Sequence, residues 1–231
     1  MTAINVIRQS AVVNIVTDGA MYRPDGTLES RTQKIFPLAH LNAIIAGRGN
    51  PLFASSVGLL ASIEASSFDH LKMLAISLAN RTFSDIEKFL IASSAGSQFD
   101  LVIAGWSKVT GPDSYFICNH EHHGPAVKPW QIVELGPISL LPRSEGIDAE
   151  LGKIFPEGVH PDDFDPVADG LRILEIQRAQ PIEHHADGFG TQPGVGAFAQ
   201  LTTITPDVIT TRILHRWPDA LGRPLAARMN D

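Results

Sequence analysis

The chain has 231 residues, 44% of them hydrophobic and 19% charged, a composition typical of a compact protein with one sizeable core. Its formal net charge of -7 argues against a nucleic-acid-binding surface. Cys118 is the only cysteine, so an intrachain disulfide is excluded and a reducing compartment is favoured. Because the first residues lack a signal-peptide pattern and no apolar run is long enough to cross a bilayer, we expect a cytoplasmic protein without a membrane partner.

The first part of the chain predicts two pairs of strands. Residues 3–7 and 11–17 are apolar and rich in β-branched side chains, and the polar residues between them indicate a hairpin. A turn follows at residues 22–26, where Pro24 presets φ and Gly26 tolerates a positive φ. Residues 34–38 and 43–46 predict the second strand pair.

Helix signals follow this strand-rich part. Asn50 is a good N-cap, and Pro51 suits the first helical turn that follows it. A second helix is expected over residues 68–80. Ser84 opens a capping-box pattern that predicts a third helix, ending near Ser94.

The second half of the chain predicts a return to strands. Residues 99–106, 114–119 and 130–135 indicate a meander, whereas residues 137–163 carry no assignable pattern. Asp165-Pro166 opens a further predicted helix.

A loop rich in glycine and proline is expected at residues 181–194. Residues 197–204 and 208–214 then predict a closing hairpin around Thr205-Pro206-Asp207. The order strands, helices, strands, helix, strands excludes a simple alternating βαβ pattern. We therefore expect an α+β fold in one domain, residues 1–231, in which residues 217–231 form a loose C-terminal tail.

Thr2 is the main candidate for a reactive residue. Once Met1 is removed, which a small following residue permits, Thr2 carries a hydroxyl nucleophile and a free α-amine that can act as its base. Asp18 and Lys34, sixteen and thirty-two residues further on, supply the charged groups that such a nucleophile needs around it. These three residues predict an N-terminal nucleophile hydrolase.

The first 49 residues resemble proteasome β-type subunits and the bacterial HslV-type peptidase. The resemblance rests on Thr2, Asp18-Gly19, Lys34-Ile35 and the turn at residues 46–49, Ala-Gly-Arg-Gly. It implies a four-layer αββα sandwich, with two antiparallel sheets between helical layers. It also implies a threonine protease that cleaves amide bonds in peptides, assembles as a homo-oligomer and needs no cofactor.

The resemblance implies a catalytic role for each matched residue. Thr2 Oγ would attack a carbonyl carbon while its α-amine takes the proton. Lys34 would lower the pKa of that amine and stabilise negative charge on oxygen, and Asp18 would hold Lys34 in place. The Gly47 N–H would donate to the oxyanion, with Thr32 and Arg48 as candidate substrate-binding residues.

Two departures from the family pattern leave other functions open. Proline follows Gly136 where the family has a serine turn, so that only Ser139 remains to support the amine, and Ala179 stands where an acid is expected after Arg178. Asp187 lies in the next loop. These changes motivate an alternative in which the same fold is an inactive structural or assembly protein. A third possibility is a hydrolase acting on a small amide.

Two histidine clusters, residues 120–123 and 183–185, suggest metal binding. Adjacent histidines on a strand point to opposite faces, and no Cys or Asp frames them at a standard ligand spacing. We therefore expect solvated loop histidines and no metal site. The chain also lacks a Gly-x-Ser-x-Gly elbow, which argues against a standard α/β-hydrolase.

Overall fold

The computed structural model of the chain describes residues 2–93, 96–155, 159–183 and 191–225. It is a mixed α+β structure with antiparallel sheets and four α-helices among these residues. None of the described helices combines the length and the apolar composition that a membrane-crossing segment requires.

One five-stranded sheet carries the N-terminus. Its strands, in spatial order, are β10 (Ile138–Leu141), β1 (Ile4–Arg8), β2 (Val13–Asp18), β13 (Phe198–Ile204) and β14 (Ile209–Arg216). The expected N-terminal hairpin is confirmed, because β1 and β2 pair antiparallel with Ile4 opposite Thr17. The closing hairpin is confirmed as β13 and β14. Since β13 pairs with β2, the C-terminal part of the chain lies beside the N-terminal hairpin.

The second five-stranded sheet holds the middle of the sequence. Its strands, in order, are β5 (Ile35–Leu38), β6 (Ala43–Gly49), β7 (Phe99–Ser107), β8 (Gly111–Cys118) and β9 (Val133–Glu134). All neighbours pair antiparallel, as expected for a meander. Two small two-stranded sheets complete the fold: β3 (Ala20–Tyr22) with β4 (Leu28–Arg31), and β11 (Ile182–Glu183) with β12 (Thr191–Gln192).

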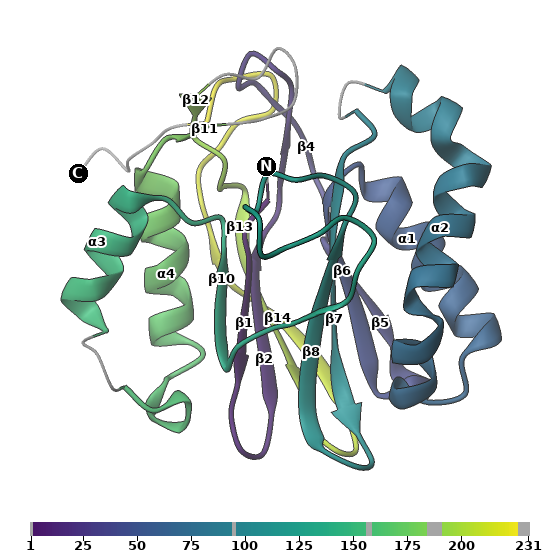
Figure 1. Cartoon of the computed structure of the whole chain (residues 1–231). Coiled ribbons are helices and arrows are strands. Elements are labelled where there is room, and N and C mark those ends of the chain that lie inside the picture. Colours follow the sequence, from purple (N-terminus) through teal and green to yellow (C-terminus); the bar gives the residue numbers. More distant parts are fainter. Residues whose placement is uncertain (1, 94–95, 156–158, 184–190, 226–231) are drawn as a thin grey trace.

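The two large sheets share a buried apolar cluster. Ile4, Val6 and Ile15 of the first sheet pack with Ile44 and Val102 of the second. The strand period of two places alternate residues on opposite faces, so Ala43 and Ile45 join a different cluster with the helices α1 (Pro51–Glu64) and α2 (Phe68–Ala92). Figure 1 shows α1 and α2 beside one sheet and α3 and α4 beside the other, an arrangement consistent with a sandwich.

The helices between β6 and β7 differ from the expectation in one respect. Asn50 caps α1 (Pro51–Glu64) as predicted, because its side chain accepts the Leu52 N–H at 3.0 Å. The second and third predicted helices are in fact one helix, α2 (Phe68–Ala92). Its buried side continues through Leu78 and Thr82 to Leu90, so packing on the sheet overrides the capping-box signal at Ser84.

The segment without an assignable pattern contains β10, α3 (Glu145–Ile154) and a short 3-10 turn at Pro161–Asp163. A second 3-10 turn, Ala39–Leu41, connects β5 to β6. Asp165 precedes α4 (Ala168–Ala179) and accepts the N–H groups of Val167 and Ala168, as a helix start requires. The amides of Asn5 and Gln177 exchange two hydrogen bonds of 2.9 Å, which ties α4 to β1.

The C-terminal segment differs from the loose tail that was expected at residues 217–231. Trp217, Asp219 and Leu225 are buried, and Leu225 donates its N–H to the Gly26 carbonyl. Residues 217–225 are therefore packed against the body, because their buried groups find partners there. Residues 226–231 lie outside the described part of the chain.

Candidate functional site

Thr2 and Asp18 lie at the same end of the β1–β2 hairpin. The register that pairs Ile4 with Thr17 brings the residue after Thr2 level with Asp18. The Asp18 carboxylate accepts the Ala3 N–H at 2.9 Å through Oδ1, and Oδ2 accepts the N–H groups of Ala20 at 3.0 Å and Gly196 at 3.1 Å. Thr2 itself is 5% exposed. Asp18 therefore fixes the backbone that positions Thr2, and does so from inside the protein.

Lys34 places a second buried charge beside this carboxylate. Its Nζ donates to the Ala20 carbonyl oxygen at 2.9 Å, so the two peptide groups of Ala20 connect Lys34 to Asp18. Among the described residues no Asp18–Lys34 ion pair within 4.0 Å is formed, and the two charges interact through space.

Burial shifts the pKa values of both groups. Desolvation raises the pKa of Asp18, opposed by the charge of Lys34 and by three backbone N–H donors. Desolvation lowers the pKa of Lys34, opposed by the charge of Asp18. Each charge therefore favours the ionised form of the other.

Gly47 lies in β6 next to Lys34 across the β5–β6 ladder. Its N–H points at the Lys34 carbonyl oxygen at 3.3 Å, a distance at the weak end of the hydrogen-bond range. A Cβ at this position would lie 2.4 Å from the Cβ of Ala54, so only glycine allows α1 to pack this closely. The close contact explains this glycine without reference to a substrate.

The two candidate substrate-binding residues occupy different environments. Thr32 is half-buried, with its N–H bonded to the Gly19 carbonyl at 2.9 Å. Arg48 is 8% exposed, and its Nη1 lies 2.8 Å from Asp100 Oδ2. Phe53, in the helix that follows Arg48, stacks on Phe99 in the core.

The sequence analysis missed Gly196 and Asp219. Asp219 accepts two hydrogen bonds from Arg178, of 2.6 and 2.9 Å, and one of 2.8 Å from the Ala197 N–H. It thereby holds the loop whose Gly196 N–H reaches Asp18. An acid thus does stand against Arg178, although not at position 179. No signal in the sequence marks it, because the contact joins segments about forty residues apart.

Ser139 does not lie level with Thr2. The β1–β10 ladder pairs Ser139 with Val6 and Leu141 with Ile4, and the Ser139 hydroxyl donates to the Gly136 carbonyl at 3.2 Å. The same register runs towards Thr2 at the Arg143–Ser144 end, where Ser144 caps α3. Asp187, the other candidate support, lies outside the described residues.

Asp100 and Cys118 frame the histidine segment after β8, contrary to the expectation that no Cys or Asp does so. Asp100 and Cys118 lie beside His120, and their possible ligand atoms are all within 4.8 Å of one another. Strand pairing of β7 with β8 places Asp100 directly opposite Cys118. His184 and His185 of the other cluster lie outside the described residues.

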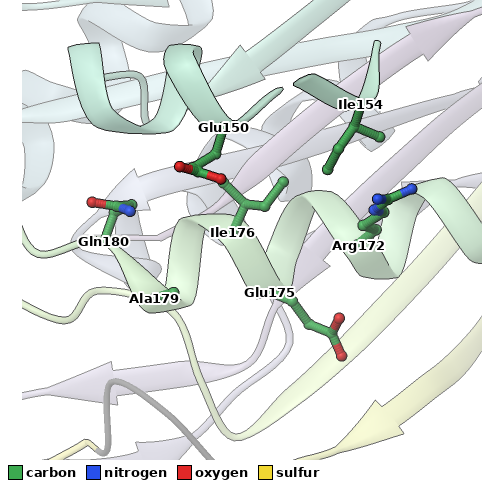
Figure 2. A pocket seen from close by; sticks show the side chains of 7 residues that line it. All are labelled: Glu150, Ile154, Arg172, Glu175, Ile176, Ala179 and Gln180. Carbon is green, nitrogen blue, oxygen red and sulfur yellow. The ribbon is translucent and has the colours of Figure 1, made fainter. Parts of the chain in front are cut away.

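A separate hollow lies between α3 and α4 (Figure 2). Its lining residues are Glu150, Ile154, Arg172, Glu175, Ile176, Ala179 and Gln180. None of these residues belongs to the Thr2 region, so this hollow offers no binding place for a molecule attacked by Thr2.

Comparisons with known proteins show what the chain is similar to. No protein-family model and no curated protein matches the sequence. Among solved structures, the fold is similar to that of Anbu (ancestral beta-subunit) from Yersinia bercovieri, with a TM-score of 0.61 and 10% sequence identity. The match covers 95% of this chain and 88% of that chain. At this identity the likeness shows a shared fold, that of a protein named as an ancestral β-subunit.

Proposed function

We propose that the chain is a proteasome-like N-terminal nucleophile hydrolase with a four-layer αββα sandwich, in which Thr2 cleaves amide bonds of peptides after removal of Met1. The observation that carries the proposal is the hydrogen bond from the Ala3 N–H to buried Asp18, with buried Lys34 beside it. Burying two opposite charges is costly, and here Asp18 accepts the N–H of the residue after Thr2 while Lys34 is linked to Asp18 through Ala20. The fold similarity to an ancestral β-subunit supports the same reading.

The proposed reaction begins with attack of Thr2 Oγ on the substrate carbonyl carbon. The α-amine, which in model peptides has a pKa of about 7.7–8.0, takes the hydroxyl proton directly or through water. That proton then passes to the leaving amine, and water hydrolyses the acyl-enzyme. The Lys34 ammonium group has three N–H donors, and one of them donates to the Ala20 carbonyl. The proposal assigns the others to Thr2 Oγ and the developing oxyanion.

Gly47 is proposed as the second oxyanion donor. Its N–H makes a weak hydrogen bond of 3.3 Å to the Lys34 carbonyl, and a substrate oxygen would replace that carbonyl as the acceptor. Thr32 and Arg48 stay proposed substrate-binding residues. Arg48 Nη1 is paired with Asp100, so Arg48 would have to contact a substrate through its other guanidinium N–H groups.

Intact-mass analysis and covalent labelling test the proposal. We expect loss of Met1, followed by labelling of Thr2 with a threonine-directed epoxyketone. Thr2→Ser should keep amide hydrolysis and Thr2→Ala should abolish it, while Thr110→Ala, in an exposed turn, serves as the matched control. Retention of Met1 in all molecules would refute the mechanism, since Thr2 would then have no free amine.

The alternative function is an inactive structural or assembly protein with the same fold. It is favoured by the Gly47 N–H in the strand ladder and by Ser139, whose hydroxyl is bonded to Gly136 instead of supporting an amine. Failure of the epoxyketone to label a chain that has lost Met1 would support this alternative.

A homo-oligomer is proposed with either function. Light scattering after size-exclusion chromatography measures the molar mass of the assembly and so the number of chains in it. A monomer or dimer would favour a small amide over a peptide as the substrate.

A further inference from the structure

We propose that Asp100, Cys118, His120 and His123 form a binding site for a divalent transition-metal ion, with Zn²⁺ as the best match. The site lies where β7 begins and β8 ends, in the segment that leads towards β9. None of its four residues belongs to the proposed catalytic set of Thr2, Asp18 and Lys34, and the metal site does not depend on the proposed hydrolysis.

The side chains of His120 and His123 both contact the same carboxylate oxygen of Asp100. Asp100 Oδ1 lies 2.9 Å from Nε2 of His120 and 2.8 Å from Nε2 of His123. The two rings approach this oxygen with their centroids 5.1 Å apart. Two nitrogens converging on one oxygen are the arrangement that a metal ion placed between them would use.

Cys118 supplies the fourth ligand atom. Its side chain is buried, and its Sγ lies 3.3 Å from the His120 carbonyl oxygen. The possible ligand atoms of Asp100, Cys118 and His120 lie within 4.8 Å of one another. One thiolate, two imidazoles and a carboxylate match the mixed S, N and O ligands that zinc binds in tetrahedral sites.

Arg48 orients the carboxylate from behind. Its Nη1 bonds Oδ2 at 2.8 Å, which leaves Oδ1 for the histidines or the metal. Hydrogen-bonded partners of this kind typically fix ligating carboxylates.

Holding zinc requires the ligand atoms to rearrange, because among the described residues the atoms within 4.8 Å of one another come from Asp100, Cys118 and His120, and His123 must move closer to the other ligands. Asp100 Oδ1 and the imidazole nitrogens must separate from 2.8–2.9 Å to about 3.3 Å, the edge of a tetrahedron with bonds of about 2.0 Å. His120 and His123 are 11% and 20% exposed and belong to a segment outside the strands, so this movement leaves the sheet intact. Binding would release the Cys118 proton and fasten the segment after β8 to β7.

Zinc binding is tested on the full chain. Protein stripped with a chelator is loaded with Zn²⁺, passed through gel filtration and analysed for metal. We expect one zinc per chain and at least about a tenfold loss of affinity in His123→Ala and in Asp100→Asn. His40→Ala removes an exposed histidine of the 3-10 turn Ala39–Leu41, outside the proposed ligand set, and should keep wild-type affinity, measured by competition with a chromogenic chelator.

Cobalt reports on the thiolate independently. Co²⁺-loaded wild type should show a thiolate-to-cobalt charge-transfer band that Cys118→Ser lacks. Circular dichroism without metal establishes that each variant is folded, and His123→Ala, as the most exposed ligand, keeps the test valid if Asp100→Asn does not fold. Absence of retained zinc in the wild type, or an equal loss in His40→Ala, would overturn the site. A cobalt spectrum without the band would remove Cys118 from it.

Discussion

Removal of the Asp219 carboxylate charge should destabilise the whole protein. Asp219→Asn keeps the shape of the side chain but leaves the guanidinium of Arg178 without its counter-charge. The two side chains are 3% and 5% exposed, and they are joined by bonds of 2.6 and 2.9 Å. Breaking a buried pair in this way costs about 3–5 kcal/mol. The Val195 carbonyl and the Trp217 ring still contact Arg178, so we expect the lower end of that range.

Urea denaturation followed by circular dichroism measures this loss as a lower midpoint at an unchanged slope. The double variant Arg178→Met/Asp219→Leu should be more stable than Asp219→Asn alone, because it buries no uncompensated charge. Glu150→Gln provides the control, since it breaks an exposed pair with Lys153 and should cost under about 1 kcal/mol. A loss below about 1 kcal/mol in Asp219→Asn, or no recovery in the double variant, would refute the reasoning.

Three further predictions test the site and its scaffold. Lys34→Met should raise the pKa of Asp18 further, because the Lys34 charge opposes the effect of burial. A raised pKa gives stability that is present at low pH and lost as pH rises through that pKa. The stability deficit of the variant relative to wild type should therefore grow as pH rises above about 4, the pKa of aspartate in an unfolded chain. Denaturation at several pH values measures this deficit. A deficit that does not change with pH would count against the coupling of the two charges, as would the same pH dependence in Lys34→Met/Asp18→Asn. Gly47→Ala should cost about 1–3 kcal/mol by overpacking against α1, whereas Gly152→Ala, with nothing within 4 Å, should gain up to about 1 kcal/mol; equal effects of the two on the thermal midpoint would contradict the contact argument. Asn50→Ala should lower stability by about 1 kcal/mol through loss of the α1 cap, and an unchanged midpoint would show that the cap is dispensable.

The strands of the two large sheets other than β10, the helices other than α3, and the candidates Thr2, Asp18 and Lys34 were predicted from the sequence because these features are local or sit at fixed spacing. Apolar residues rich in β-branched side chains give the β1–β2 hairpin, and the register of a hairpin brings its two ends together. Asn50 acts within one helical turn, so its role was also accessible. The capping-box pattern at Ser84 misled because a local signal competes with the continuous burial of α2 on its sheet.

The sequence by itself determined which residues could act as nucleophile, acid and base. Only the tertiary structure decided which of them meet, since contacts between distant segments depend on the whole set of packed surfaces. Asp219 reaches Arg178 from the C-terminal segment, and Gly196 reaches Asp18 across the first sheet. The pairing of β7 with β8 likewise brings Asp100 opposite Cys118, next to histidines that the sequence places in a solvated loop. Hydrogen bonding and ion pairing require distances of a few ångströms, and the folded chain sets those distances.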